Sequence, residues 1–303
     1  MFPSGFSTTR GCRTTTSAAE PTESDPAAAV GQAADPGPAI AVEAGAATAA
    51  DTAAIVERLR AAGCVFAEDE AQLLIDSAPS PVVLRQMVER RVAGLPLEHI
   101  VGWVDFCGLR IAVDPGVFVP RRRTELLARQ AATLAVRGAT VLDLGCGSGA
   151  IGVAVANLVA GVELHASDVD PAAVRCALRN LAPLGGQVYA GDLYDALPAG
   201  LRGRIDVLVA NVPYVPTGAV ELLPPEARLH EPLVALDGGP DGLDVLRRVA
   251  TGAREWLAPG GHLLLETSRA QVADALDALT GAGLTPTVVS DEELLGTAVI
   301  GRR

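Results

Sequence analysis

A strand-like run that leads directly into a glycine-rich turn and then into a helical segment limits the folds open to this chain. Residues 141–152 read Val-Leu-Asp-Leu-Gly-Cys-Gly-Ser-Gly-Ala-Ile-Gly. Gly145, Gly147 and Gly149 permit positive φ angles and let the backbone approach a ligand without a Cβ in the way. Such a turn serves a dinucleotide, a nucleoside or strand–helix packing alone, so by itself it leaves all three open.

The chain repeats this alternation of apolar runs and helical segments from about residue 125 onward. Alternation of this kind is typical of a parallel sheet with helices on both faces. We predict seven strands, at Thr140–Leu144, Val162–Ser167, Gln187–Ala190, Ile205–Ala210, Gly261–Thr267, Thr285–Ser290 and Thr297–Ile300. We predict five helices, at Glu125–Val136, Ala150–Val159, Pro171–Ala182, Gly242–Leu257 and Ala270–Gly281. Because only a short loop joins the last two strands, the final strand should pair antiparallel at the edge of the sheet.

Smaller units precede the sheet domain, to which we assign residues 125–303. Apolar residues recur at helical steps over residues 51–100, which predicts a small helical domain. Residues 101–124 contain two short alternating runs on either side of Cys107-Gly108, which predicts a β-hairpin linker. Residues 1–50 hold too few large apolar side chains to offset the entropy of ordering, so we expect a disordered tail rich in Ala, Thr and Pro.

Composition and charge exclude several functions. The chain has 36 acidic and 24 basic residues and a net charge of -12, the wrong sign for stable nucleic-acid binding through a broad basic face. None of the basic residues is Lys, so chemistry that needs a Lys, such as a Schiff base, is excluded. The five cysteines and four histidines form no C-x-x-C or i, i+4 pair, and we expect no metal site. The odd number of dispersed cysteines, with no membrane-spanning run or export signal, predicts a cytoplasmic protein.

Acidic residues follow two of the later strands, at the sheet edge where open α/β sheets bind ligands. Asp168 follows the second strand, from which a carboxylate can accept both hydroxyls of a ribose. Asp192 follows the third strand and can accept from the exocyclic amine of an adenine, while Leu193 covers the ring. Together these strand ends predict an adenosine-containing cofactor. Taken singly, Asp168 could instead cap the helix at Pro171, and Asp192 could be a solvated turn residue.

The segment Asn211-Val212-Pro213-Tyr214 follows the fourth strand and therefore lies at the same edge. Pro213 keeps Val212 extended, which stiffens the loop and can aim the carbonyl of residue 212 outward. With the side-chain carbonyl of Asn211, that carbonyl offers two acceptors to a planar –NH2 group. Such a nitrogen is a poor nucleophile unless it is held toward an electrophile. Tyr214 supplies a flat face for a planar substrate group, although a plain β-turn with a buried Tyr is the other interpretation of this motif.

Across residues 51–303 the chain resembles the HemK/PrmC family of protein-glutamine methyltransferases, which use S-adenosylmethionine to methylate a glutamine side-chain amide in a protein. The matching segments keep the family order: Gly94–Gly102, Val119-Pro120-Arg121 with Thr124-Glu125, Asp143–Gly149, Asp168, Asn180, Gly191-Asp192, Asn211–Tyr214, Glu231-Pro232 with Ala235-Leu236, Gly238-Gly239, Asp241-Gly242, Gly260-Gly261 and Leu263–Glu266. The resemblance implies an α/β fold, the Rossmann-like seven-stranded S-adenosylmethionine-dependent methyltransferase fold. A small N-terminal helical domain and a β-hairpin linker would precede it.

The resemblance also implies roles for individual residues. The cofactor would be held by Asp143, Gly145, Cys146, Gly147, Ser148 and Gly149 around its methionine part, by Asp168 at the ribose, by Asp192 and Leu193 at the adenine, and by Asn211. The glutamine amide would be bound by Asn211, Val212, Pro213 and Tyr214. The acceptor would be a protein bearing a glutamine, a peptide chain release factor or another translation protein, recognised by the helical domain. We expect a monomer with no membrane partner and no stable nucleic-acid binding.

The chain departs from the family pattern in two places. Val212 stands where the family usually has Pro, which retains the backbone carbonyl but removes a rigid ring. Arg122-Arg123 stand where Pro-Glu is common. Both changes indicate a divergent branch. A nicotinamide-dependent oxidoreductase would give no use for Asn211–Tyr214, and two other functions stay open. One is an adenine-N6 methyltransferase of nucleic acid, since the same asparagine motif can hold an adenine amine. The other is a cofactor-binding scaffold without transfer activity.

Overall fold

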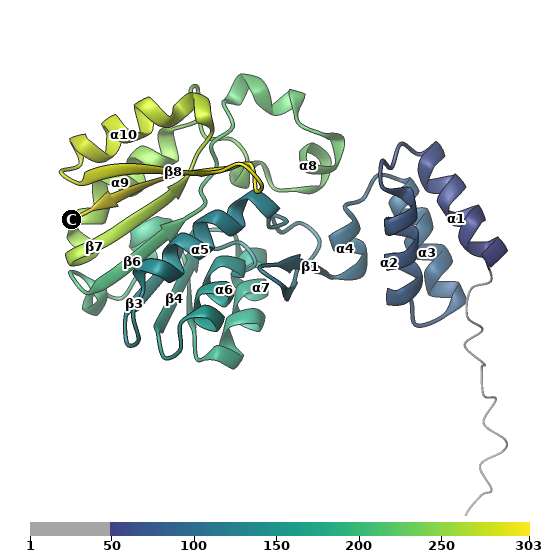
Figure 1. Cartoon of the computed structure of the whole chain (residues 1–303), viewed down its shortest axis with the longest axis horizontal. Helices are drawn as coiled ribbons and strands as arrows, with labels where there is room; N and C mark the ends of the chain where they lie inside the picture. The colour runs from purple at the N-terminus through teal and green to yellow at the C-terminus, as the bar shows by residue number, and fades with distance from the viewer. Residues whose placement is uncertain (1–48) are drawn as a thin grey trace, which may run out of the picture. The chain divides into compact units, whose positions relative to one another are not determined.

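The structure, a computed structural model, describes residues 49–303 (Figure 1). The disordered tail predicted for residues 1–50 lies outside these residues, except for residues 49 and 50, which begin the first helix. Within residues 49–303 no helix has both the length and the apolar character needed to cross a membrane.

Four helices form the N-terminal part of the described chain: α1 (Ala49–Ala61), α2 (Ala67–Ser77), α3 (Pro81–Val92) and α4 (Leu97–Val101). The start of α3 follows from its sequence, because the Ser80 hydroxyl accepts from the Val83 amide and Pro81 occupies the first turn, where no N–H is needed. The four helices share a core of their own, built from Ile55, Leu59, Leu74, Met87, Val88 and Ile100.

A two-stranded antiparallel hairpin follows, with strands β1 (Trp103–Phe106) and β2 (Leu109–Ala112). Its turn residues Cys107 and Gly108 have φ angles of 52° and 74°. Positive φ at both central positions is the requirement of a type I′ turn, whose twist matches that of the two strands.

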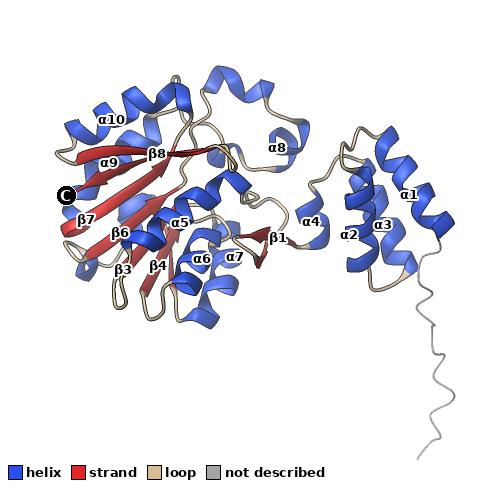
Figure 2. Ribbon diagram, viewed as in Figure 1, coloured by secondary structure: helices blue, strands red, loops and turns tan. Residues whose placement is uncertain are grey.

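The main sheet has seven strands, β3 (Thr140–Leu144), β4 (Glu163–Asp168), β5 (Gln187–Ala190), β6 (Ile205–Ala210), β7 (Leu257–Glu266), β8 (Thr285–Asp291) and β9 (Gly296–Arg302). Their order across the sheet is β5-β4-β3-β6-β7-β9-β8, and Figure 2 shows them side by side. The five strands β3 to β7 run parallel, and β9 runs antiparallel to both of its neighbours. This order confirms the predicted seven-stranded α/β fold.

The predicted place of the last strand was wrong. Strand β9 lies between β7 and β8, and β8 forms the edge. Burial explains the order, because β9 is buried over nearly its whole length whereas β8 is largely exposed. Pro286 in β8 also favours the edge, since a proline has no N–H to donate to a neighbouring strand.

Helices cover both faces of this sheet. One apolar core lies under α5 (Glu125–Leu134), α6 (Ala150–Leu158) and α7 (Pro171–Leu181), and a second lies under α9 (Asp244–Trp256) and α10 (Val272–Gly281). Figure 1 shows the two groups on opposite sides of the strands. All five helices were predicted, with ends that differ by one or two residues.

The long connection between β6 and α9 was not predicted to contain helices. It holds the short helix α8 (Pro225–His230) between two 3-10 turns, η5 (Thr217–Leu222) and η6 (Leu233–Ala235). We call residues 217–236 the cap segment, because they border the cavity described below. The other 3-10 turns are η1 (Arg122–Thr124), η2 (Ala182–Leu184), η3 (Leu193–Ala196), η4 (Ala199–Leu201) and η7 (Arg269–Gln271).

Candidate active site

The centre of the sheet brings the two main sequence motifs together. Strand β3 pairs in parallel with β4 on one side and β6 on the other. The glycine loop leaves the carboxyl end of β3, and Asn211 leaves the carboxyl end of β6, so the two loops are neighbours. The chain continues from β3 and β6 toward opposite halves of the sheet. This is the switch point at which open α/β sheets bind ligands.

A cavity of about 400 Å³ lies at this point, within the range of roughly 300–1,000 Å³ that is usual for small-molecule sites. Among its wall residues are the predicted site residues Gly145, Cys146, Gly147, Ser148, Asp168, Asp192, Leu193, Asn211, Val212, Pro213 and Tyr214. Two other predicted site residues, Asp143 and Gly149, are not wall residues. The hairpin linker and the cap segment complete the wall.

The glycine loop is shaped by backbone angles that other residues rarely adopt. Gly145 and Gly147 have φ angles of 71° and 55°. A Cβ on Gly147 would meet no atom within 4 Å, which is consistent with open space for a ligand beside the loop. The Ser148 carbonyl accepts from Asn180 at 2.8 Å, and the same Asn180 amide donates to Ala112 of β2 at 2.9 Å. The loop is therefore fixed to both α7 and the linker.

Asp143 lies beneath the loop. It is fully buried, and its Oδ2 accepts from the Gly152 amide at 2.9 Å. Its Oδ1 has no hydrogen-bond partner within residues 49–303. Burial raises the pKa of Asp143 to about 7, because the charged form is poorly solvated there. Asp143 thus supports the start of α6 and contributes a weakly acidic group under the cavity floor.

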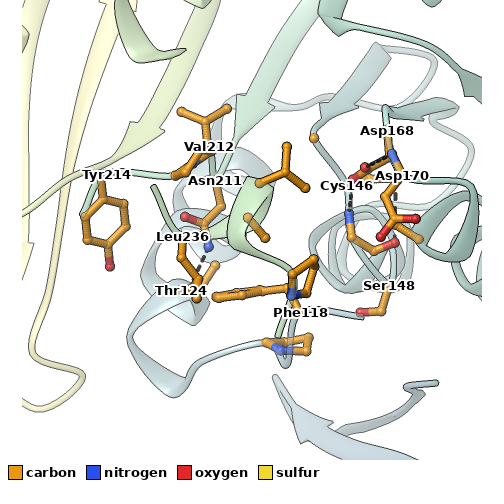
Figure 3. Close-up of a pocket in the computed structure, with 18 of the residues that line it drawn as sticks. Phe118, Thr124, Cys146, Ser148, Asp168, Asp170, Asn211, Val212, Tyr214 and Leu236 are labelled. Atoms are coloured by element: carbon orange, nitrogen blue, oxygen red, sulfur yellow. Dashed lines mark hydrogen bonds between the residues drawn. The ribbon is translucent and has the colours of Figure 1, made fainter. Parts of the chain in front are cut away.

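Asp168 fixes the glycine loop and faces the cavity (Figure 3). One carboxylate oxygen accepts from the Gly147 amide at 2.8 Å and the other from the Asp170 amide at 2.9 Å. Burial raises the pKa of Asp168, and these two backbone hydrogen bonds oppose that effect. Each carboxylate oxygen can accept more than one hydrogen bond, so Asp168 can also receive ligand hydroxyl groups.

The far end of the cavity holds Asp192 and Leu193. Leu193 has a φ of 48°, which is uncommon for a residue with a Cβ and turns its side chain onto the cavity wall. Asp192 pairs with Arg248 of α9 at 2.7 Å, and both side chains are about half exposed. Arg248 was not predicted from the sequence, since it comes from a helix without a recognisable motif.

The Asn211 loop forms the opposite part of the wall (Figure 3). Asn211 donates through Nδ2 to the Thr124 hydroxyl at 3.3 Å. This contact leaves the side-chain carbonyl of Asn211 available as an acceptor. Val212 is buried against the glycine loop, since a Cβ on Gly145 would lie 3.7 Å from its Cγ1. Tyr214 donates to Glu266 at the end of β7.

A buried ion pair ties the linker to the cap segment. Both carboxylate oxygens of Glu231 accept from Arg121 at 2.6 Å, and one also accepts from the Val119 amide at 3.1 Å. The Glu231 side chain is only 1% exposed. The sequence places Glu231 and Arg121 in segments that match the family but assigns them no role, because they are 110 positions apart and no local pattern links them.

Comparison with known proteins identifies the family. The methyltransferase small domain family matches residues 108–223. A release factor glutamine methyltransferase of Geobacter sulfurreducens is 40% identical over 201 residues, which cover 66% of this chain and 70% of that protein. One of Mycolicibacterium smegmatis is 35% identical over 265 residues, which cover 84% of this chain and 93% of that protein. The chain belongs to the HemK/PrmC family. This membership confirms the resemblance found in the sequence.

Another relative in these comparisons has a different acceptor. It is a 4-amino-L-phenylalanine/4-methylamino-L-phenylalanine methyltransferase of Streptomyces pristinaespiralis, 38% identical over 237 residues that cover 76% of this chain and 80% of that protein. Membership of the HemK/PrmC family therefore gives the reaction class, methyl transfer, while proteins of similar sequence differ in the molecule that they methylate.

As a member of this family, the chain is a methyltransferase whose cofactor is S-adenosylmethionine. The cavity fits this cofactor on two observations. The buried hydroxyls of Ser148 and Ser167 have no hydrogen-bond partner within residues 49–303, so both are free to bind a polar ligand group. The open space beside Gly147 lies next to the Asp168 carboxylate, which suits a ribose.

The raised pKa of Asp143 predicts a dependence of stability on pH. The pKa is about 7 in the folded protein against 3.8 as the ordinary value. Between these two pH values the folded state binds more protons than the unfolded state. The free energy of unfolding should therefore fall as the pH rises through this window, and then stay level above it. The fall should approach about 1.4 kcal/mol per pH unit.

Urea denaturation of the cofactor-free protein and of Asp143→Asn, measured from about pH 5 to about pH 8, tests this prediction. The amide cannot ionise, so the wild type should lose stability relative to the variant up to about pH 7 and no further. A difference between the two proteins that stays constant over the whole range would contradict the shifted pKa.

Proposed function

We propose that the protein transfers the methyl group of S-adenosylmethionine to the side-chain amide nitrogen of a glutamine in a peptide chain release factor. The observation that carries the proposal is the common cavity of Asn211–Tyr214 and the glycine loop. The names and coverage of the Geobacter and Mycolicibacterium relatives support the acceptor.

We assign roles along the cavity wall. The methionine part of the cofactor would lie at Gly145–Ser148, with Asp143 and Gly149 supporting that loop from behind. Asp168 would accept the ribose hydroxyls. Asp192 would accept from the adenine amine with Leu193 against the ring, provided that Arg248 shares the carboxylate or moves aside.

Bound S-adenosylmethionine supplies an electrophilic methyl group. The side-chain carbonyl of Asn211 and the backbone carbonyl of Val212 would each accept one N–H of the glutamine amide, while Pro213 keeps the loop stiff and Tyr214 packs on the amide plane. Orientation and exclusion of water then account for catalysis. No general base is assigned, because an amide nitrogen that gains a methyl group becomes strongly acidic and loses a proton to water.

A second acceptor class has support from the comparisons. The name of the Streptomyces relative gives 4-amino-L-phenylalanine as acceptor. Its match covers 76% of this chain, against 66% for the Geobacter relative. An aryl amine is planar and poorly nucleophilic, like an amide, so the same two carbonyl acceptors could hold it. By contrast, the relatives' names give no support to an adenine in nucleic acid, and the net charge of -12 opposes it.

A transfer assay with radiolabelled S-adenosylmethionine separates these acceptors. Purified release factor, 4-amino-L-phenylalanine and a nucleic-acid mixture are offered in parallel, and mass spectrometry locates the label. We expect label on a glutamine of the release factor, and none on a release factor with that glutamine changed to Ala. Label on the aryl amine alone would replace the proposed acceptor, and cofactor binding without transfer to any acceptor would favour the scaffold.

We further propose that the helical domain takes part in acceptor recognition through the cap segment. Arg91 of α3 is buried, and its guanidinium binds Glu70 of α2 at 2.6 Å and Glu226 of α8 at 2.6 Å. Glu226 is also a wall residue of the cavity. The helical domain therefore contacts a residue that an acceptor in the cavity would meet.

Replacing Glu226 with Ala should raise the KM for release factor by about three- to tenfold, the effect of losing one partly exposed charged contact. The kcat and the affinity for cofactor should stay close to those of the wild type. The matched control is Glu221→Ala, which removes an exposed glutamate from the same cap segment. Equal KM values for Glu226→Ala and Glu221→Ala would contradict a role of this contact in recognition.

We also propose that the protein acts as a monomer in the cytoplasm without stable binding to nucleic acid. The excess of acidic residues supports the last point, and the four cysteines of the described chain, which are all free thiols, are consistent with a reducing compartment.

A further inference from the structure

Three polar side chains meet behind the Asn211 loop. Arg123 donates one N–H, at Nε, to the Tyr214 hydroxyl at 2.8 Å and to Oε1 of Glu266 at 3.1 Å. The Tyr214 hydroxyl in turn donates to the same Oε1 at 2.9 Å. Each of the three groups therefore contacts the other two, although they come from η1, from the loop after β6 and from the end of β7.

The Glu266 carboxylate depends on these two neighbours. Its side chain is 4% exposed, and its Oε2 has no hydrogen-bond partner in the part of the chain that the structure describes. A buried carboxylate is stable only when it is paired and hydrogen bonded. Arg123 supplies the positive charge and Tyr214 supplies a hydroxyl donor. Burial and the Glu266 charge both raise the pKa of Tyr214, which keeps its hydroxyl protonated as that donor.

The 3-10 turn η1 contacts both ends of the Asn211 loop. Thr124, next to Arg123 in η1, accepts from the Asn211 amide, and Arg123 binds the Tyr214 hydroxyl. The backbone of Tyr214 is held separately, because its carbonyl accepts from Gln271 at 2.9 Å. Arg123 therefore orients the Tyr214 ring, whereas Gln271 holds the backbone.

The two departures from the family pattern meet at this place. Val212 lacks the ring that would fix its φ, so the loop is intrinsically less rigid there. Arg123 stands at the other departure, and its guanidinium pairs with Glu266. Arg123 restrains the Asn211 loop through a side-chain contact, its hydrogen bond to the hydroxyl of Tyr214 at the end of that loop.

We propose that Arg123 is a positioning residue for methyl transfer: with Glu266 it holds the ring of Tyr214 in place against the planar acceptor group. The proposal rests on the proposed function only for the identity of the acceptor. An amide and an aryl amine are both planar, so Arg123 has the same role for either.

A double-mutant cycle of Arg123→Met and Tyr214→Phe tests the proposal. The methionine keeps apolar bulk without charge, and the phenylalanine keeps the ring without its hydroxyl. We expect each variant to lower kcat about ten- to hundredfold through misorientation, with the KM for acceptor changed less than kcat. Because both variants break the contact between Arg123 and Tyr214, the double variant should have about the kcat of the less active single variant, to within a factor of about three.

Arg122→Met is the matched control, since it removes an exposed positive charge from the same turn. It should keep the wild-type kcat. The proposal is wrong if the losses of the two single variants multiply in the double variant, because Arg123 would then act on the acceptor directly. It is also wrong if Arg123→Met keeps full activity.

A crystal structure of Arg123→Met provides a readout that needs no transfer. We expect the Tyr214 ring to leave its position or to occupy more than one rotamer, while Gln271 still holds the backbone. A ring in an unchanged single position would overturn the proposal. If the wild type labels an aryl amine and no glutamine, the proposed function fails, and the cycle is measured with the aryl amine.

Discussion

Asn211→Ala should lower the rate of methyl transfer by about 10²–10³-fold, the usual effect of removing one preorganised polar group at a reacting centre. Asn211 stands directly after β6, beside the glycine loop, and its Nδ2 is held by Thr124. The alanine removes one of the two carbonyl acceptors that would orient the acceptor nitrogen. The other acceptor, the backbone carbonyl of Val212, remains in the variant, so the acceptor nitrogen would be held through one N–H instead of two.

Two measurements make this result specific. Calorimetric titration with S-adenosylmethionine should show that Asn211→Ala still binds the cofactor, with a Kd raised far less than the transfer rate is lowered, which shows that the fold and the rest of the cofactor site are intact. Asn157→Ala, on α6, removes an asparagine that bonds only within its own helix, to the Val153 carbonyl, and should keep full activity. Unchanged transfer by Asn211→Ala would exclude the role assigned to this side chain.

Asp168→Ala should weaken cofactor binding by about 10²-fold or more. Two hydrogen bonds from ribose hydroxyls to a carboxylate contribute about 1.5–3 kcal/mol each. The alanine would also release the Gly147 and Asp170 amides, which Asp168 now accepts from, so the glycine loop loses its shape as well. Titration with S-adenosylhomocysteine, the demethylated product, measures the loss without turnover.

The control for this prediction is Asp195→Ala, an exposed aspartate in η3 that is not part of the cavity wall. It should bind the product as the wild type does. The affinity of Asp168→Asn for the product should lie between those of Asp168→Ala and the wild type. The amide retains one carbonyl acceptor for the loop but lacks the charge. Equal affinity of Asp168→Ala and the wild type would show that the ribose lies elsewhere.

Much of the fold could be predicted because its signals are local. Strands β3, β5 and β6 have the predicted bounds, since each is followed directly by a glycine or an asparagine that ends the run. Pro286 is the local signal for the edge position of β8, whereas the short loop between the last two strands gives only their antiparallel pairing and not which of them is the edge. The helices of the cap segment had no apolar period to reveal them, because residues 217–236 pack on the cavity and not on the sheet.

The order of the motifs along the chain was enough to predict that Asp168, Asp192 and Asn211 share one edge with the glycine loop. In a parallel sheet the carboxyl ends of all strands lie at the same edge. Residues that directly follow these strands in the sequence are therefore expected at that edge. The family motifs then indicated the cofactor and the kind of acceptor nitrogen.

The side chains that support that edge could not be predicted from the sequence, because they depend on packing between distant elements. The pairing of Arg91 with Glu226 and the meeting of Arg123, Tyr214 and Glu266 join elements far apart in the chain. The sequence has 36 acidic residues, and its pattern does not indicate which of them pairs with a given arginine. The packing of the linker and the cap segment around the cavity brings one carboxylate within reach of each guanidinium and buries it, which makes that pairing the favourable one.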